Sequence, residues 1–166
     1  MTMEGLSMKK LLKLLEQDCT MSRDQLATMC GMTREEVDQT IATCEKEGIL
    51  RGYQALVDWD RVTPDAVTAL IHVNVTPQTS AGYERIAERI YEYEEVESLY
   101  LMSGAFDFTV LISGRTLKEV AEFVSNRLAP IEGVTGTATH FILSRYKEQH
   151  LTFRKRKGQE ERFVFE

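Results

Sequence analysis

The chain has 166 residues, of which 43% are hydrophobic and 28% are charged, and its formal net charge at pH 7 is −6. This composition is too apolar for a disordered chain, and the length suits one medium domain or two small ones. No apolar run approaches the roughly 20 residues that cross a bilayer, and the charged, amphipathic first residues do not resemble a secretory signal. We therefore expect a cytoplasmic protein.

The cysteines agree with this expectation. Cys19, Cys30 and Cys44 are odd in number, widely spaced and without a C-x-x-C pair. A three-cysteine metal site is the alternative, but all three fall where helices would bury small side chains, which favours reduced thiols. The three histidines also lack metal-ligand spacing. We expect neither a metal nor a cofactor.

The first fifty residues are predicted to form three short helices. Residues 8–17 place apolar side chains at helical spacing, with Ser7 as a plausible N-cap. Residues 23–30 follow a capping box of Ser22 and Gln25, and Gly31 ends that helix. A third helix over residues 34–47 would bury Val37, Ile41 and Cys44.

The third helix also begins with a capping box, formed by Thr33 and Glu36, and Gly48 is a natural stop. Two short helices joined by a Cys-Gly-Met turn are typical of a helix-turn-helix, although helix pairs also occur in many bundles. The residues after Gly48, "ILRGYQALVDWD", have β character and predict a wing or a linking strand. Pro64 marks the best candidate linker, "RVTPDA".

From residue 66 the period-two pattern of strands dominates. The predicted order is strand, helix, strand, strand, helix, strand, over residues 66–75, 82–93, 96–102, 106–114, 116–128 and 134–146. This βαββαβ order is the ferredoxin-like split unit, so the fold class is α+β. Both helices would cover one face of the sheet, and alternation in "LIHVNV" and "FDFTVLI" leaves apolar residues on the other. Homo-oligomerisation would cover that second face.

Charge is distributed unevenly along the chain. Residues 1–50 have a net charge of −3, residues 51–143 of −6, and residues 144–166 of +3, centred on "FRKRKG". A basic run of this kind is most often a solvated tail. The alternative is a nonspecific phosphate-contacting arm, because lysine and arginine neutralise phosphates without a sequence code.

Catalytic motifs are scarce in this sequence. It has no G-x-S-x-G, no phosphate-cradling glycine-rich loop and no H-E-x-x-H. Asp107, which lies between two phenylalanines after a tight turn, could be a general base or could bind a small polar ligand. We favour a structural role, in which it fixes the hairpin turn through backbone hydrogen bonds.

Three features together resemble the Lrp/AsnC (leucine-responsive/feast-famine) transcription regulators. These are the helix-turn-helix, the link "GILRGY" over residues 48–53, and a βαββαβ domain with "SGAFDF" in its hairpin and "GVTGTAT" over residues 133–139. The resemblance covers about residues 8–148. It implies four segments: a DNA-binding domain over 1–52, a linking strand and linker over 53–65, a ligand-sensing and oligomerisation domain over 66–148, and a basic tail over 149–166.

The resemblance implies partners as well as a fold. Such proteins bind double-stranded DNA, form dimers that assemble into tetramers or larger rings, and bind amino acids or related metabolites between dimers. By motif, the effector site would involve Met102, Gly104, Phe106, Asp107, Thr137 and Thr139. A turn offers backbone N–H groups to a carboxylate, and the hydroxyls can donate or accept.

The third helix departs from the family pattern, because Thr40, Ala42 and Thr43 stand where arginines are common. The stretch over residues 31–50 also carries five acids against two bases. Few phosphate contacts would remain, and assembly into an oligomer would compensate through avidity. We predict DNA contacts from Arg23, Thr33, Arg34, Glu35, Gln39, Thr40, Thr43 and Arg51.

We therefore predict a sequence-specific DNA-binding regulator that senses an amino acid or a related metabolite and is not an enzyme. One alternative is a metabolite-sensing oligomer of the same fold that has lost DNA binding, which the acidic third helix would explain. Another is an enzyme like the sirohaem decarboxylases, in which His72 or His140 would handle the porphyrin. The hairpin "YLMSGAFDFTV" matches the regulators better.

Overall fold

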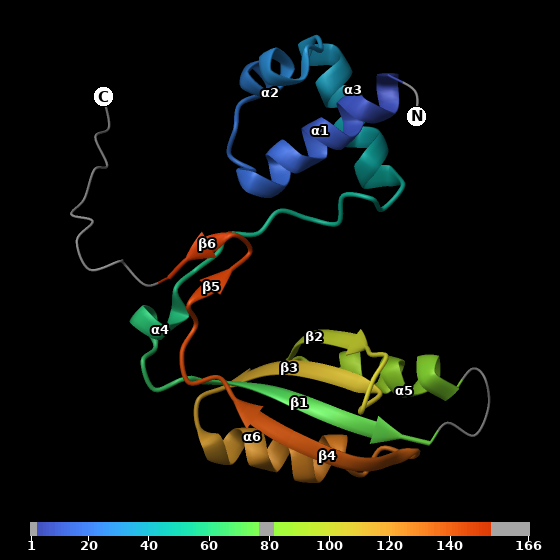
Figure 1. Cartoon of the computed structure of the whole chain (residues 1–166), viewed down its shortest axis with the longest axis vertical. Coiled ribbons are helices and arrows are strands. Elements are labelled where there is room, and N and C mark those ends of the chain that lie inside the picture. Colours follow the sequence, from blue (N-terminus) through green and yellow to red (C-terminus); the bar gives the residue numbers. More distant parts are fainter. Residues whose placement is uncertain (1–2, 77–81, 154–166) are drawn as a thin grey trace. The chain divides into compact units, whose positions relative to one another are not determined.

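A computed structural model describes residues 3–76 and 82–153 of the chain (Figure 1). The chain divides into two compact units, Met1–Val57 and Asp58–Glu166. The division falls within the segment 53–65 that the sequence suggests as a link. Each unit has an apolar core of its own, which is the property that defines a folding domain.

Three helices form the N-terminal unit: α1 (Met3–Gln17), α2 (Arg23–Cys30) and α3 (Arg34–Lys46). Aliphatic side chains from all three helices are buried together and form the core of this unit, namely Leu11, Leu14, Leu15, Leu26, Val37 and Ile41. Full burial of one such side chain contributes about 1.5–3 kcal/mol. The stability of the unit therefore depends mainly on this core.

The start of α1 differs from the sequence prediction. The helix begins at Met3, so Ser7 lies inside it and is not its N-cap. Nothing between these residues stops a helix, since Gly5 costs only about 1 kcal/mol relative to alanine and there is no proline.

The predicted wing or linking strand is wrong. Residues 49–57 are all described, and none of them is in a strand. Leu50 packs against the core of the N-terminal unit, whereas Ile49 and Tyr53 stay exposed. A strand needs a paired neighbour, and these residues have none within the described part of the chain. A short helix, α4 (Trp59–Val62), follows.

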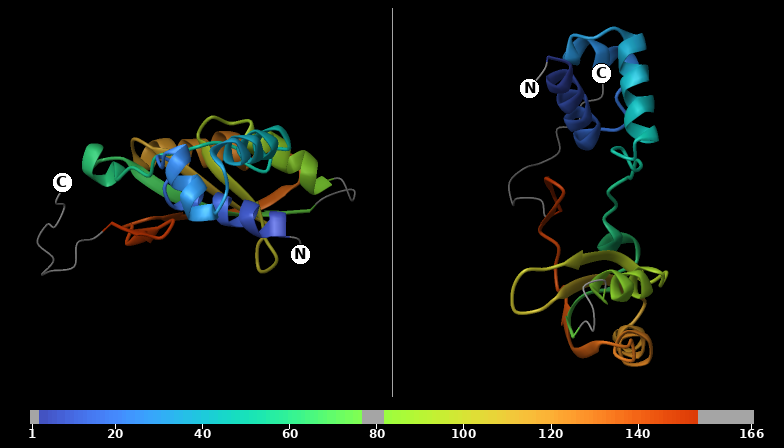
Figure 2. Two further views of the ribbon diagram at one scale, coloured as in Figure 1. Left: turned by 90° about the horizontal axis from the view of Figure 1, so that it is seen from above. Right: turned by 90° about the vertical axis from the view of Figure 1, so that its right-hand side faces the viewer.

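The C-terminal unit has the predicted βαββαβ order, which confirms the α+β fold class. Its elements are β1 (Val67–Val75), α5 (Gly82–Tyr91), β2 (Val96–Leu101), β3 (Phe108–Gly114), α6 (Leu117–Phe123) and β4 (Val134–Phe141). The strands form one antiparallel sheet in the order β2-β3-β1-β4. Figure 2 shows this unit from two further directions.

The two faces of the sheet differ in what covers them. Ala69, Ile71 and Val73 of β1 are fully buried in the core that includes residues of α5 and α6. The alternate residues, among them Leu70 and His72, point to the opposite face, which we call the open face. Register places Leu70 beside Leu111 and His72 beside Thr109 on this face.

The last part of the C-terminal unit differs from the prediction in three respects. Helix α6 continues as a π-helix, η1 (Val124–Leu128), in which the Ala129 N–H donates to the Val124 carbonyl at 2.8 Å. Strand β4 ends at Phe141, earlier than expected. A small hairpin of β5 (Lys147–Glu148) and β6 (Leu151–Thr152) then straddles the start of the predicted tail. The basic run 154–157 lies outside the described residues.

Candidate functional site

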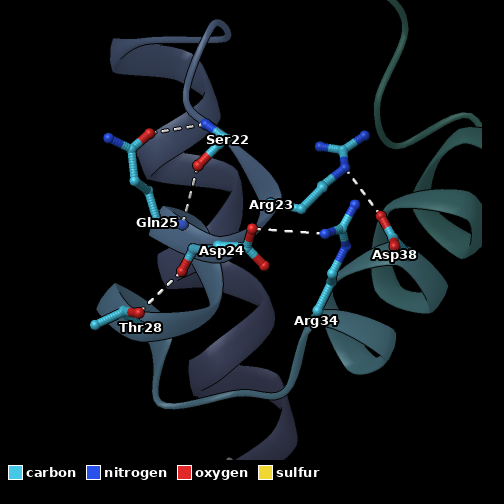
Figure 3. A network of polar contacts seen from close by, with 7 residues as sticks. All are labelled: Ser22, Arg23, Asp24, Gln25, Thr28, Arg34 and Asp38. Atoms are coloured by element: carbon cyan, nitrogen blue, oxygen red, sulfur yellow. Dashed lines mark hydrogen bonds and ion pairs between the residues drawn. The ribbon is translucent and has the colours of Figure 1, made fainter.

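Local hydrogen bonds fix the start of α2 and the turn between α2 and α3. The Gln25 N–H donates to Ser22 Oγ at 3.3 Å, and the Ser22 N–H donates back to Gln25 Oε1 at 2.9 Å (Figure 3). The Glu36 N–H donates to Thr33 Oγ1 at 3.2 Å, and the Thr33 N–H donates to Glu36 Oε2 at 2.8 Å. Gly31 ends α2 at φ +66°, where glycine is favoured. Both predicted capping boxes are confirmed.

The side of α3 opposite its buried stripe is available to a partner. Val37, Ile41 and Cys44 are buried, which orients the other side chains outward. The Thr40 hydroxyl donates to the Glu36 carbonyl at 2.7 Å, and the Thr43 hydroxyl donates to the Gln39 carbonyl at 2.8 Å. These threonines therefore offer methyl groups and acceptor lone pairs outward. Among the residues predicted to contact DNA, those exposed on α3 are Arg34, Glu35, Gln39 and Thr43, and Thr40 is half-buried.

Both arginines at the starts of these helices are paired with acids of the other helix. Arg23 Nε, at the first position of α2, lies 2.9 Å from Asp38 Oδ1 of α3. Arg34 Nη1, at the first position of α3, lies 3.5 Å from Asp24 Oδ2 of α2. Figure 3 shows the two pairs joining α2 and α3. These pairings could not be predicted from the sequence, because they form between two helices.

Arg23 has a second polar neighbour in Tyr53, the tyrosine of "GILRGY". The Tyr53 hydroxyl donates to Glu45 Oε1 of α3 at 2.9 Å. Burial raises the pKa of Tyr53 and the bond to Glu45 raises it further, while a hydrogen bond with Arg23 acts in the opposite direction. Arg51 lies against Gly48, where a Cβ would be 3.2 Å from the Arg51 Cζ.

In the C-terminal unit, Asp107 ties the β2–β3 turn to two other elements. Its Oδ2 accepts the Val75 N–H at 2.8 Å, and its Oδ1 accepts the Tyr83 hydroxyl of α5 at 3.2 Å. Its backbone N–H donates to the Val73 carbonyl at 3.0 Å, and its carbonyl accepts the Met102 N–H at 2.7 Å. The hydrogen bond to this carboxylate raises the pKa of Tyr83. These contacts support the structural role for Asp107.

Phe106, the neighbour of Asp107, lies on the open face. Its ring stacks on His72 with centroids 3.5 Å apart and planes at 10°, and His140 lies 4.7 Å from His72. Thr109, the cross-strand neighbour of His72, has a buried hydroxyl with no hydrogen-bond partner among the described residues. The open face therefore carries an aromatic cluster beside an unsatisfied hydroxyl.

The six predicted effector-site residues do not all lie on one face of the sheet. Thr137 pairs directly with Val73, and Thr139 with Ile71, so both hydroxyls lie on the face that α5 and α6 cover. Phe106 lies on the open face, while Met102 and Gly104 are exposed in the turn. Within one chain these residues line no common pocket among those described.

The described residues form a cavity of about 300 Å³ elsewhere, beside α6 and η1. Arg127 of η1 reaches across to Glu95 at 2.7 Å and lies over the Tyr93 ring at 5.6 Å. The sequence did not indicate this cavity, because its shape depends on the π-helix. Its lining residues are Glu95, Ile112, Ser113, Gly114, Glu119, Val120, Glu122, Phe123, Asn126 and Arg127.

Residues 3–76 and 82–153 contain no group of three His, Cys, Asp or Glu side chains that could hold a metal ion. The described helices include none that is long and apolar enough to cross a membrane. The three cysteines are free thiols, and burial raises the pKa of Cys30 and of Cys44.

Comparison with known proteins identifies both parts of the chain. Residues 68–152 match the model of the Lrp/AsnC ligand binding domain, and residues 8–62 match a Crp-like helix-turn-helix domain. YugG, an HTH-type transcriptional regulator of Bacillus subtilis, is 41% identical over 145 residues, 87% of each chain. The DNA-binding transcriptional activator DecR of Escherichia coli is 27% identical over 139 residues, 84% of this chain and 91% of that one.

Solved structures agree in fold. A transcriptional regulator of Neisseria meningitidis, solved as a complex with L-Met, has a TM-score of 0.69 at 20% identity, covering 92% of this chain and 96% of that one. E. coli AsnC has a TM-score of 0.66 at 16% identity, covering 86% and 93%. The relatives found by sequence carry the names of transcriptional regulators, which are not enzymes.

Proposed function

The chain belongs to the Lrp/AsnC family of transcriptional regulators, and we propose that it binds specific DNA through α3 and responds to an amino acid or a related metabolite. The DNA-binding part of this proposal rests on one observation: α2 and α3 each begin with a capping box, and the outer side of α3 is exposed. Action on DNA would place the protein in the cytoplasm.

The outer side of α3 provides groups for reading bases. Gln39 suits adenine, and Arg34 suits guanine, because each can make a bidentate contact. Thr40 and Thr43 offer methyl groups, which suit the methyl of thymine. Arg23, Arg51 and, where it does not reach a guanine, Arg34 are the phosphate contacts. With so few of them, one pair of helices binds weakly, and an oligomer that presents several pairs gains affinity through avidity.

Fluorescence anisotropy tests this proposal. The protein is titrated into labelled DNA from upstream of its own gene and into random DNA, at several salt concentrations. We expect tighter binding to the upstream DNA. Gln39→Ala should reduce the preference over random DNA by about 5- to 150-fold, since a bidentate base contact is worth about 1–3 kcal/mol. Gln17→Ala, at the exposed end of α1, is the matched control. Equal binding to both DNAs would refute the proposal.

For the effector we propose a site at the β2–β3 turn, completed by a second chain. Gly104 and Met102 are exposed there, and the turn can offer backbone N–H groups to a carboxylate. Because Thr137 and Thr139 lie on the other face of the sheet, a neighbouring chain would bring them to the same ligand. The Neisseria regulator with L-Met supports an amino acid as the ligand class.

A thermal-shift screen of amino acids, followed by three variants, tests the location of the effector site. A Cβ added at Gly104 meets nothing within 4 Å, so Gly104→Ala should fold normally but crowd a ligand at the turn. Gly52→Ala, at an equally open position, is the control. Retained binding in Gly104→Ala together with lost binding in Asn126→Asp would move the site to the cavity beside η1.

We also propose that the open face of the sheet is an interface between copies of the chain. Leu70, Leu111 and Tyr100 lie on this face at neighbouring positions, and Tyr100 is exposed. An exposed apolar face of this kind favours association. Sedimentation velocity should show an oligomer that Leu111→Arg dissociates. Leu117→Arg, on the exposed side of α6, should leave it intact. A monomeric wild type would contradict this proposal.

The second candidate function is a metabolite-sensing oligomer that has lost DNA binding. The observation that favours it is the engagement of Arg23 and Arg34 by aspartates, which leaves α3 poor in cations. A thermal shift with an amino acid, but no binding to any DNA at low salt, would identify this function.

A further inference from the structure

We infer that Asp24 and Asp38 compete with DNA phosphates for Arg34 and Arg23, and so set the strength and salt dependence of DNA binding. This inference rests on the proposed DNA-binding function.

The positions of the four residues carry the inference. Arg23 and Arg34 occupy the first positions of α2 and α3, where free N–H groups and the helix dipole also favour a phosphate. Each arginine is met by an aspartate of the other helix, at 2.9 Å for Arg23 and 3.5 Å for Arg34 (Figure 3). Each arginine that a phosphate would contact is therefore already paired with a carboxylate.

The aspartates are not needed to hold the helices together. The four side chains are 35–73% exposed, and exposed ion pairs add little to stability. The packing of α2 on α3 comes from Leu26, Val37 and Ile41, and the turn is fixed by Gly31 and by the capping box of Thr33 and Glu36. Replacing the aspartates by asparagines should therefore leave the N-terminal unit folded.

The two pairs differ in how strongly they hold the arginine. Arg23 is the less exposed of the two arginines, its pair is the shorter, and Tyr53 also bonds to it. Arg34 is more exposed and its pair is longer. A phosphate that contacts Arg23 must either displace Asp38 or lie close to its negative charge. Asp38 should therefore oppose DNA binding more than Asp24 does.

The experiment compares wild type, Asp24→Asn, Asp38→Asn and the double variant in anisotropy titrations on random and upstream DNA. Each single variant should bind about fivefold more tightly at low salt, with the larger gain in Asp38→Asn. The slope of log K against log salt should steepen by up to about two in the double variant, since each restored phosphate contact adds about 0.9. Circular dichroism checks that the variants are folded.

Two controls separate this competition from a general effect of charge. Glu47→Gln removes one acid at the opposite end of α3 and should change affinity less than twofold. In an Arg23→Ala background, Asp38→Asn should lose most of its effect, because the coupling belongs to the pair. An equal gain in both backgrounds would overturn the inference.

The remaining outcomes separate the inference from the proposed function. Specific binding by wild type with no gain in the variants refutes the competition and leaves the regulator function standing. Weaker binding by Asp38→Asn refutes it too, because the aspartate would then orient the arginine for DNA. No binding by wild type or double variant overturns both. Binding by the double variant alone supports the inference.

Discussion

Asp107→Ala should destabilise the C-terminal unit by about 2 kcal/mol. The substitution removes the acceptor of the Val75 N–H bond, which is 2.8 Å long and lies at the buried end of β1. A hydrogen bond to a charged acceptor contributes about 1.5–3 kcal/mol, and the half-buried position of Asp107 favours the lower part of that range. Loss of the Tyr83 bond adds to the effect.

Urea denaturation of the full chain, followed by far-UV circular dichroism, measures this change. Hydrogen exchange of the Val75 amide gives a local reading, and that amide should exchange faster in the variant than neighbouring β1 amides do. Asp107→Asn keeps one acceptor oxygen and should lose less, about 1 kcal/mol. Tyr83→Phe removes only one hydrogen bond of Asp107, so it should lower the free energy of unfolding less than Asp107→Ala does.

A loss below about 0.5 kcal/mol in Asp107→Ala would refute the structural role of this carboxylate. If stability were unchanged while the response to an amino acid disappeared, Asp107 would instead act on the ligand directly.

Three further predictions concern single residues of the two units. Gly133→Ala should destabilise the C-terminal unit by about 2 kcal/mol, because φ is +94° and a Cβ would lie 2.9 Å from Ile86 Cδ1; Gly136→Ala, without either restriction, should change urea stability little. Thr33→Ala should cost the N-terminal unit about 1 kcal/mol in the same assay through loss of its cap, whereas Thr43→Ala should cost less. The Thr20 hydroxyl and N–H bonds hold the pKa of Asp18 below its ordinary value of 3.8. The folded state therefore binds this proton less readily than the unfolded state, so the stability that Asp18 contributes is present above pH 3.8 and is lost as pH falls through the lowered pKa. In thermal melts, the melting temperature of Asp18→Asn should fall less steeply with decreasing pH than that of the wild type. An equally steep fall would contradict this.

Features that depend on neighbouring residues could be predicted from the sequence. The capping boxes of Ser22 with Gln25 and of Thr33 with Glu36 occur as predicted, because the groups that bond are three residues apart. The βαββαβ order also follows from local hydrophobic periods. Residues 49–57 show the limit of such reasoning, since their β character meets no strand to pair with.

Features that depend on distant residues escaped prediction. The pairs of Arg23 with Asp38 and of Arg34 with Asp24 form only once α2 has packed on α3. The separation of Phe106 from Thr137 follows from strand register, which the chain order alone does not define. The cavity beside α6 is lined in part by the π-helix η1. The i to i+5 hydrogen bonds of a π-helix have no distinct sequence signal.

The most direct test of the central claim is one anisotropy measurement on upstream DNA, repeated with each amino acid in turn. We expect tighter binding to this DNA than to random DNA, and a shift in affinity of about 5- to 150-fold with at least one amino acid, the usual range of coupling between sites. Binding that is equal on both DNAs, or that no amino acid changes, would contradict the claim that this chain is a metabolite-responsive regulator.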